Sequence, residues 1–388
     1  MRILIVLTYY RPYTSGLTIY AERLARAFAR RGHEVTVLTS QFDRHLPRLD
    51  NLNGVRLVRI PPLMRISKGL LMPAMPFEAW KLVRQADVIN LHMPQLDAAY
   101  IAWFGKLMQK PVILTYQCDL RLPKGPIHNV ANQVSNFANH IAAWASDNIA
   151  ALTRDYAEHS TYLTRYLNKV HVVDPPVELP PASDADMRAF REKYEIRTGQ
   201  RIIGMAARMA TEKGVEYLVQ ALPQVLEHVP EARVLYVGSY RNVVGEETYV
   251  DRILPLIENL KGHWSLLGSL SEVEMTAFFK TCEVLVLPSL NSTEAFGMVQ
   301  VEAMICGTPV VATDLPGVRV PVKTSGMGKI VPAADASAIA LAILDILAKP
   351  EQFRGNSAEI VHKYSPDVIA AGYERLFEDI LQGRKQQI

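Results

Sequence analysis

Short apolar strands alternate with amphipathic helices along this chain, and the alternation runs twice. In the first half, strands are expected at residues 2–7, 35–39, 55–60, 88–91, 112–115, 148–152 and 170–173, with helices at 18–31, 95–108 and 127–145. In the second half, strands are expected at 201–207, 233–238, 283–288 and 309–313, with helices at 215–228, 249–260, 272–281, 297–306 and 336–348. Strands that alternate with helices form parallel sheets covered on both faces. The sequence therefore predicts an α/β fold with two doubly wound, Rossmann-like domains.

A proline-rich stretch separates the two runs. Residues 174–186 contain four prolines, which cannot continue a helix or a central strand. The predicted organisation is an acceptor-side domain at 1–173, a linker at 174–186, a nucleotide-sugar domain at 187–365 and a terminal helix at 366–388 that crosses back toward the first domain. Ligands of doubly wound sheets bind beyond the carboxyl ends of the strands. We therefore expect the functional residues in loops that follow strands and face a cleft.

Composition indicates a globular protein of a reducing compartment. The chain has 388 residues, of which 49% are hydrophobic and 21% charged. Its three cysteines, at 118, 282 and 306, are scattered and have no metal-ligand spacing. Residues 1–7 do not have the pattern of a signal peptide, and no apolar run approaches the roughly 20 residues of a membrane span. We expect a cytoplasmic protein.

Charge is distributed unevenly between the halves. Residues 1–150 hold 18 Lys and Arg against 9 Asp and Glu, a net of +9, and the remainder has 24 against 30, a net of −6. The basic half is either an ordinary solvated surface or a surface that attracts an anionic membrane or acceptor. The apolar, proline-broken residues 63–80 favour peripheral contact with a membrane. No nucleic-acid motif accompanies the charge, so nucleic acid is not an expected partner.

Two carboxylates eight residues apart, Glu294 and Glu302, bracket the start of the helix expected at 297–306. The amides and dipole of a helix N-terminus attract anions. Amides beside carboxylates suit a ligand with both phosphates and hydroxyls, such as a nucleotide sugar. Taken singly, Glu294 is equally an acid that stabilises a helix terminus, and Glu302 a solvated helix residue.

Two cations and a glycine lie in other loops that follow strands. Arg208 and Lys213 flank the loop after the strand at 201–207, where they can clamp a diphosphate and neutralise it as it departs. They are alternatively plain surface charges. Gly16 follows the first strand and either lets backbone amides approach a phosphate or is an ordinary loop glycine. The missing Gly-x-Gly-x-x-Gly motif argues against a dinucleotide-binding dehydrogenase.

Together these pieces match a specific pattern. Arg-x4-Lys-Gly at 208–214, followed from residue 294 by Glu-Ala-Phe-Gly-x4-Glu-Ala-x3-Gly-Thr-Pro-Val-Val-Ala, resembles the retaining nucleotide-sugar glycosyltransferases of glycosyltransferase family 4, which have the GT-B fold. The resemblance is dense over residues 200–320. In the first half it is thinner, with Gly-His-Glu-Val at 32–35.

The resemblance implies a role for each matching position. Arg208 and Lys213 would bind the diphosphate and assist its departure, Glu294 would contact the donor sugar, and Glu302 would bind the ribose. The remaining donor-side positions are Phe296, Gly297, Met298 and Val299 through their amides, Gly16 beside the diphosphate, and Leu267 and Gly268 near the base. No metal and no cofactor are implied, because the cations and the helix amides supply the positive charge. The Asp-x-Asp at 184–186 lies in the expected linker and is taken as a coincidence.

The acceptor side departs from the family. Leu17 follows Gly16 where the family often has a second glycine. Residues 115–119 read Thr-Tyr-Gln-Cys-Asp where many members have Thr-x-His-x-Asp. Gln117 cannot act as a base, so this position and Asp119 are expected to hydrogen-bond a sugar. His92, after the strand at 88–91, either touches the acceptor or is structural.

The expected activity is retaining transfer of a hexose from a UDP- or GDP-sugar to a hydroxyl of a lipid-linked or glycan acceptor, as in cell-envelope or polysaccharide biosynthesis. Two alternatives stay open. One is a nucleotide-sugar 2-epimerase of the same fold, and the other is a protein that binds sugar nucleotides without turnover.

Overall fold

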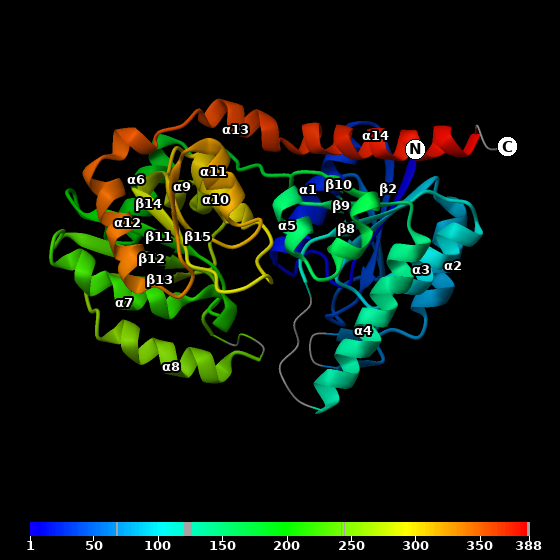
Figure 1. Cartoon of the computed structure of the whole chain (residues 1–388), viewed down its shortest axis with the longest axis horizontal. Helices are drawn as coiled ribbons and strands as arrows, with labels where there is room; N and C mark the ends of the chain where they lie inside the picture. The colour runs from blue at the N-terminus through cyan, green and yellow to red at the C-terminus, as the bar shows by residue number, and fades with distance from the viewer. Residues whose placement is uncertain (67–68, 120–125, 242, 244, 386–388) are drawn as a thin grey trace. The chain divides into compact units, whose positions relative to one another are not determined.

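The structure, a computed structural model, describes residues 1–66, 69–119, 126–241, 243 and 245–385. The chain forms two compact α/β units (Figure 1). One comprises Met1–Pro176 with Tyr364–Ile388, and the other comprises Val177–Lys363. We call them the N-terminal and the C-terminal unit. The predicted fold class is confirmed, because each unit is built on a parallel sheet with helices on both faces.

The N-terminal unit contains an eight-stranded sheet in the order β10-β9-β8-β7-β1-β2-β4-β3. Its strands are β1 (Arg2–Val6), β2 (Glu34–Ser40), β3 (Leu49–Leu52), β4 (Val55–Ile60), β7 (Val88–Met93), β8 (Val112–Tyr116), β9 (Asn148–Ala151) and β10 (Val170–Val172). Only β3 pairs antiparallel in the part of this sheet that is described. A separate hairpin joins β5 (Met64–Ile66) and β6 (Gly69–Leu71).

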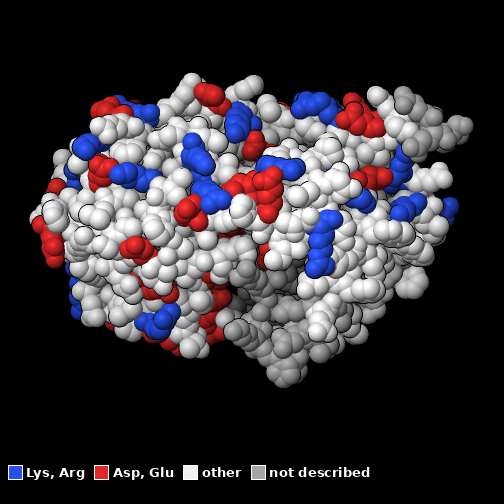
Figure 2. Space-filling model, in the orientation of Figure 1, with Lys and Arg blue, Asp and Glu red and all other residues white. Residues whose placement is uncertain are grey.

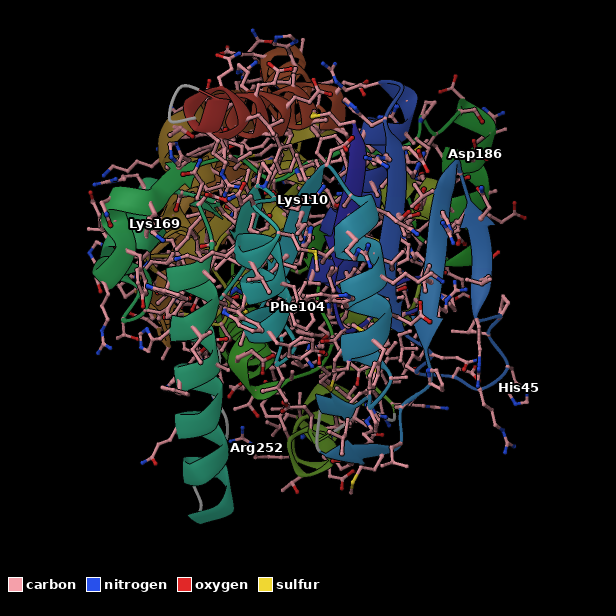
Figure 3. All side chains as sticks on the ribbon, turned by 90° about the vertical axis from the view of Figure 1, so that its right-hand side faces the viewer. His45, Phe104, Lys110, Lys169, Asp186 and Arg252 are labelled. Atoms are coloured by element: carbon pink, nitrogen blue, oxygen red, sulfur yellow. The ribbon has the colours of Figure 1, made fainter. Side chains whose placement is uncertain are left out.

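Helices cover both faces of this sheet. They are α1 (Gly16–Arg30), α2 (Met75–Gln85), α3 (Ala98–Leu107), α4 (Pro126–Ala145), α5 (Arg154–His159), the 3-10 helix η1 (Leu163–Lys169) and α14 (Pro366–Lys385). Figure 3 shows α2, α3 and α4 side by side on one face, in agreement with their mutual contacts. On the other face α14 lies against α1. There the hydroxyl of Tyr373 is 2.8 Å from those of Tyr20 and Thr115, which ties the terminal helix to the buried sheet.

The C-terminal unit has a six-stranded, fully parallel sheet in the order β13-β12-β11-β14-β15-β16. Its strands are β11 (Arg201–Ala206), β12 (Ala232–Val237), β13 (Trp264–Gly268), β14 (Val284–Leu287), β15 (Val310–Thr313) and β16 (Gly328–Val331). Its helices are α6 (Asp184–Lys193), η2 (Thr211–Lys213), α7 (Val215–Leu226), α8 (Glu247–Glu258), α9 (Glu272–Thr281), α10 (Met298–Ile305), α11 (Arg319–Ser325), α12 (Ala336–Ala348), η3 (Pro350–Phe353) and α13 (Ser357–Tyr364).

A large apolar core fills the space between the C-terminal sheet and helices α7, α8 and α12. It includes Leu218 and Leu222 of α7, Ile253 of α8 and Ile343 of α12, all completely buried. Burial of each such side chain contributes on the order of 1.5–3 kcal/mol. Both acidic and basic side chains lie on the visible face of this unit (Figure 2).

Local sequence signals account for several helix starts. Ser271 and Glu274 form a capping box at the start of α9 (Glu272–Thr281), where the sequence predicts a helix. The Ser271 backbone N–H donates to Glu274 at 3.0 Å, and the Glu274 N–H donates to Ser271 Oγ at 3.3 Å. Ser183 and Asp186 form a second capping box, so α6 begins at Asp184, within the stretch expected to be a linker. Asp186 of the Asp-x-Asp sequence is thereby engaged in capping.

Helix α2 was not expected from the sequence. The two prolines of residues 69–80 were interpreted as breaks, but Pro76 lies in the first turn of α2, where a helix needs no N–H from that residue. Short or edge elements were also missed, namely β3, β5, β6, β16, α5, α11 and α13. No helix within the described ranges is both long and apolar enough to span a bilayer.

Candidate donor-binding site

The topological switch point of the C-terminal sheet lies between β11 and β14. These neighbouring strands pair through Ile203 with Val284 and Gly204 with Leu285. From β11 the chain continues outward to β12 and β13, and from β14 it continues to β15 and β16 on the other side. The loops that follow β11 and β14 therefore diverge and leave a crevice at the carboxyl edge, the usual ligand position in such sheets. Residues 207–214 and 288–297 form these two loops.

Gly214 holds the two loops together. It has φ +63°, and a Cβ atom at this position would lie 2.2 Å from the carbonyl oxygen of Pro288. Only glycine fits both the left-handed conformation and this close approach. The Leu290 N–H also donates to the Glu212 carbonyl at 3.0 Å. The backbone of the first loop is consequently fixed against the backbone of the second.

The structure brings Lys213 and Glu294 into direct contact. Lys213 Nζ lies 2.5 Å from Glu294 Oε2, and the two side chains are 19% and 16% exposed. A turn centred on Asn291 presents the glutamate, because the Glu294 N–H donates to the Asn291 carbonyl and the Thr293 hydroxyl donates to Asn291 Oδ1. A cation and a carboxylate thus share the crevice and remain accessible to a ligand.

Arg208 lies on the same loop as Lys213 and is paired with Glu212. Its side chain is 43% exposed, so the guanidinium is available to an incoming anion. An exposed pair of this kind contributes at most about 1 kcal/mol to stability. Exchange of Glu212 for a diphosphate therefore costs little.

Helix α10 begins at Met298 without a capping side chain. Its N-cap, Gly297, has φ +76°, and a Cβ atom there would lie 2.4 Å from Leu287 Cδ2. The first turn contains no acidic residue, so its dipole and amides favour an anion. Val299 is in this turn, and Phe296 is buried just before it.

Gln300 fixes the approach to α10. Its buried side chain donates to the carbonyl of Phe296 and, at 3.0 Å, to the carbonyl of Val318. Glu302 lies about one turn after the start of α10 and is 9% exposed. Burial sets this carboxylate apart from a solvated helix residue.

Two further donor-side predictions, Leu267 and Gly268, fall at the end of β13. Gly268 has φ +70° with no atom within 4 Å of a Cβ position, and its carbonyl accepts from the Gly238 N–H at 2.8 Å. Leu267 precedes it and is partly exposed. Both residues lie on the same carboxyl edge of the sheet as the crevice, two strands away from β11.

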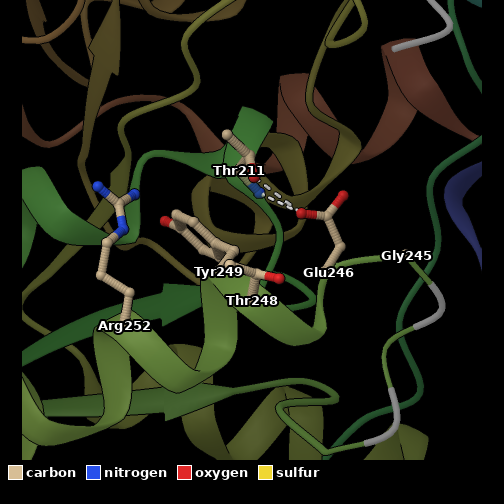
Figure 4. A pocket seen from close by; sticks show the side chains of 6 residues that line it. All are labelled: Thr211, Gly245, Glu246, Thr248, Tyr249 and Arg252. Carbon is tan, nitrogen blue, oxygen red and sulfur yellow. Dashed lines mark hydrogen bonds between the residues drawn. The ribbon is translucent and has the colours of Figure 1, made fainter. Parts of the chain in front are cut away.

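A pocket of about 320 Å³ lies beside the first loop (Figure 4). Its wall includes Thr211, Glu246, Tyr249 and Arg252, and none of the predicted site residues. The Thr211 backbone N–H and hydroxyl both donate to Glu246, at 3.0 and 2.8 Å. The Val215 N–H donates to the Tyr249 hydroxyl at 3.1 Å. The start of α8 therefore braces the loop that carries Lys213.

The acceptor-side predictions fall in the N-terminal unit, as does Gly16, which was predicted on the donor side. The switch point of this unit lies between β1 and β7. Gly16 is exposed and is the first residue of α1, after the loop that follows β1. His92 is within β7, completely buried, and its Nδ1 is 3.2 Å from Gln117 Nε2. Burial lowers the pKa of His92 to about 3, so its imidazole is neutral.

Asp119 is engaged within the protein. Its carboxylate accepts hydrogen bonds from the Tyr116 hydroxyl at 2.8 Å and the Ser160 hydroxyl at 2.6 Å. Its backbone N–H donates to the Tyr156 hydroxyl at 2.7 Å. These contacts favour a structural role for Asp119.

Sequence reasoning missed the residues that hold the loops in place, chiefly Glu212, Glu246, Asn291 and Gln300. Asn291 carried a signal, because Asn followed two residues later by Thr is typical of a side-chain-stabilised turn. The partners of Glu246 and Gln300 depend on tertiary packing and have no local signature. Within the described ranges, no group of three or more His, Cys, Asp or Glu side chains has the arrangement of a metal site.

Two family models match the chain. Residues 186–377 match the model described as glycosyl transferases group 1, and residues 15–176 match the glycosyl transferase 4-like domain. The chain is 25% identical over 397 residues to the phosphatidyl-myo-inositol mannosyltransferase of Mycobacterium leprae, with 100% of both chains covered. It is 30% identical over 358 residues to the D-inositol 3-phosphate glycosyltransferase of Xylanimonas cellulosilytica, covering 86% of this chain and 83% of the relative.

Solved structures share the fold. Anabaena HepE in complex with UDP and glucose superposes with a TM-score of 0.77 at 18% identity, covering 98% of this chain and 100% of that one. Sucrose-phosphate synthase from Thermosynechococcus elongatus gives 0.76 at 22% identity, covering 98% and 99%. At these identities the likeness concerns the fold alone.

Proposed function

The chain belongs to the glycosyltransferase family 4 enzymes of GT-B fold, and on that premise we propose that it is a retaining hexosyltransferase. It transfers a hexose from a UDP- or GDP-sugar to a hydroxyl of a lipid-linked or glycan acceptor. The observation that carries this proposal is the contact of Lys213 with Glu294 at the switch point of the C-terminal unit. Cation and carboxylate there match the two parts of the donor, the diphosphate and the sugar.

In the proposed complex, the diphosphate takes the place of the carboxylates that now engage the two cations. Arg208 leaves Glu212, and Lys213 leaves Glu294. The first-turn amides of α10, at Met298 and Val299, then face the phosphates or the sugar. Glu294, released from Lys213, accepts hydrogen bonds from sugar hydroxyls, and Glu302 accepts them from the ribose. The base lies along Leu267 and Gly268.

The reaction proceeds with attack on the face from which the diphosphate departs, so the anomeric configuration is retained. The departing phosphate oxygen takes the proton of the acceptor hydroxyl. Arg208 and Lys213 stabilise the negative charge that grows on the leaving group, and no metal is required. Preorganised charges of this kind are usually the largest single contribution to lowering a barrier.

The acceptor is proposed from three observations. The first 150 residues have a net charge of +9, as 18 basic against 9 acidic residues. The names of two relatives specify phosphatidyl-myo-inositol and D-inositol 3-phosphate. Cys118, Cys282 and Cys306 form no disulfide in the described part of the chain, in keeping with a reducing compartment. We infer a cytoplasmic enzyme that reaches an anionic, lipid-linked acceptor at the inner face of the cell membrane, in cell-envelope or polysaccharide biosynthesis.

The first experiment is a thermal-shift screen of UDP, GDP, ADP and their sugars with the full-length protein. A ligand that binds only the folded state raises the melting temperature by mass action. The donor found in this way is then incubated with inositol phosphate, phosphatidylinositol and oligosaccharides, and the product is examined by NMR. If the anomeric bond is axial in both the donor and the product, the configuration is retained. An inverted product would contradict it.

The same incubations separate the two alternatives. An epimerase converts the donor alone into a new nucleotide sugar, whereas a transferase without acceptor releases only nucleotide and free sugar by slow hydrolysis. A protein that merely binds sugar nucleotides gives a thermal shift but neither product.

A further inference from the structure

The loop that carries Lys213 is also held on the side of β12. The Met209 N–H donates to the carbonyl of Ser239 at 2.8 Å. Ser239 follows β12, and the chain continues from there into α8. The start of α8 contacts the same loop at Thr211 and the residue after the loop, Val215. The loop therefore lies between two supports, the loop after β14 and the start of α8.

Glu246, the N-cap residue of α8, makes the first of these contacts. Its Oε2 atom accepts two hydrogen bonds from Thr211, one from the backbone N–H at 3.0 Å and one from the hydroxyl at 2.8 Å (Figure 4). Thr211 opens the 3-10 helix η2, and Lys213 ends it. A shift of the Thr211 backbone is thus passed to Lys213 within one short turn.

Tyr249 makes the second contact, about one turn further along α8. It is 6% exposed, and its hydroxyl accepts from the Val215 N–H at 3.1 Å and donates to the carboxylate of Glu216. Glu216 also pairs with Arg252 at 3.3 Å. These groups fix the start of α7, just after Lys213. The chain is therefore anchored to α8 both before and after Lys213.

The support itself is fixed within the C-terminal unit. Gly238, at the end of β12, has φ +131°, and a Cβ atom there would lie 2.0 Å from the carbonyl oxygen of Ala207. Its N–H donates to the Gly268 carbonyl at 2.8 Å, on the predicted base side of the site. Ile253 of α8 is completely buried in the core. Glu246 thus extends from a fixed helix and can set the position of a loop that packs on it.

The contact between Glu246 and Thr211 is solvent-exposed. Such a contact contributes little to the free energy of unfolding, because water replaces either partner. It does constrain geometry, since Thr211 lies two positions before Lys213. Displacement of a catalytic group by about 1 Å can lower the rate by about 10². The expected effect of Glu246 on turnover is consequently larger than its effect on stability.

We propose that Glu246 is a positioning residue for sugar transfer, which holds Thr211 so that the ammonium group of Lys213 faces the departing diphosphate. Glu246 acts through Lys213 and does not itself touch the donor. The inference rests on the proposed function, because it takes Lys213 as a ligand of the diphosphate. It adds a residue on a different element, α8, to the donor site.

The test is a double-mutant cycle on the full-length protein with Glu246→Ala, Lys213→Ala and the double variant. Calorimetric titration with UDP and UMP, and with GDP and GMP, gives the preference for a diphosphate over a monophosphate. Lys213→Ala and Glu246→Ala should each lower this preference about tenfold or more, and the double variant should equal Lys213→Ala. A residue that acts through Lys213 has no effect once the lysine is absent.

Turnover and control variants complete the test. The kcat for sugar transfer should follow the same non-additive pattern, while the KM for the acceptor is unchanged. Glu246→Gln keeps an oxygen that accepts from Thr211, so it should retain most of the turnover. Glu258→Ala removes an exposed acid at the other end of α8 and should equal the wild type in every measurement. The urea midpoint of Glu246→Ala should stay close to that of the wild type.

Three results would overturn the proposal. They are an unchanged diphosphate preference in Glu246→Ala, losses that add up in the double variant, and a Glu246→Gln variant as impaired as Glu246→Ala. If Lys213→Ala loses the preference while Glu246→Ala retains it, the positioning role is wrong and the diphosphate clamp stands. If neither variant loses the preference, the clamp of the proposed function is wrong, and the positioning role is wrong with it.

Discussion

Lys213 Nζ and Glu294 Oε2 are 2.5 Å apart although 81 residues separate them in the chain. The contact joins the loop after β11 to the loop after β14, across the switch point of the C-terminal sheet. In the proposed mechanism the two groups have different ligands, the diphosphate and the sugar. On this proposal, the ion pair occupies the donor site until the donor separates Lys213 from Glu294.

Glu294→Gln is expected to separate turnover from nucleotide binding. The change keeps the size of the side chain and removes its charge, so Lys213 is freed for the diphosphate. We predict a fall in kcat of about 10²–10³ with UDP or GDP affinity equal to or higher than that of the wild type. Steady-state kinetics and calorimetric titration of the nucleotide provide the two values. A weaker nucleotide affinity would contradict the assignment of Glu294 to the sugar.

Gly214→Ala is expected to damage the site through the backbone. The added Cβ would lie 2.2 Å from the Pro288 carbonyl oxygen, so the two loops must move apart. Gly262→Ala is a matched control, because Gly262 also has positive φ, +84°, but has no atom within 4 Å of a Cβ position. Both variants incur a backbone strain of about 1–3 kcal/mol, visible in urea denaturation. Only Gly214→Ala should also lose nucleotide affinity, by at least tenfold. An equal loss of nucleotide affinity in Gly214→Ala and Gly262→Ala would contradict the role of the loop contact.

Glu302→Ala is expected to weaken donor binding more than turnover. Glu302 is 9% exposed on α10, and its proposed partner, the ribose, is the same in substrate and transition state. An interaction made equally in both states affects KM rather than kcat. Donor titration should show an affinity loss of about tenfold or more, since hydrogen bonds to charged groups contribute about 1.5–3 kcal/mol. Unchanged donor affinity would eliminate the ribose assignment.

The pH dependence of stability should reveal buried, neutral His92. Its folded pKa is lowered to about 3 from 6.5, so only the unfolded chain takes up a proton between these values. Its stabilising contribution is complete above pH 6.5 and falls with decreasing pH, by about 1.4 kcal/mol per unit. Denaturation at about pH 7.5 and at about pH 5 gives the free energy of unfolding at each pH. Between these two values it should fall by roughly 2 kcal/mol more for the wild type than for His92→Gln. Equal losses would mean that His92 is accessible to protons when folded.

The sequence was most informative where structure is set locally. Ser271 and Glu274 predicted the start of α9 because a capping box needs only four consecutive residues. Pro76 was wrongly interpreted as a helix break. Proline breaks a helix when it lies in the helix interior, but it is well tolerated in the first turn, where Pro76 lies in α2. Short edge strands such as β16 are stabilised by their neighbours and leave little pattern in sequence.

The sequence allowed the residues of the candidate site to be proposed, but it did not predict the contacts that they make. Arg208, Lys213 and Glu294 stood out because they follow strands, as ligand-binding residues of parallel sheets do. Lys213 pairs with Glu294, and Arg208 pairs with Glu212. This pairing depends on the close approach of two loops at Gly214 and Pro288, which the sequence does not reveal. The buried setting of His92 and the hydrogen bonds of Asp119 are likewise properties of the folded unit.

The central claim is that Arg208 and Lys213 stabilise the departing diphosphate. The most direct measurement is kcat for sugar transfer by Arg208→Ala and Lys213→Ala, with Lys323→Ala on α11 as an exposed control. Loss of one preorganised charge costs about 3–4 kcal/mol, so each clamp variant should be about 10²–10³ slower while the control equals the wild type. Near-normal turnover in both clamp variants would contradict the account.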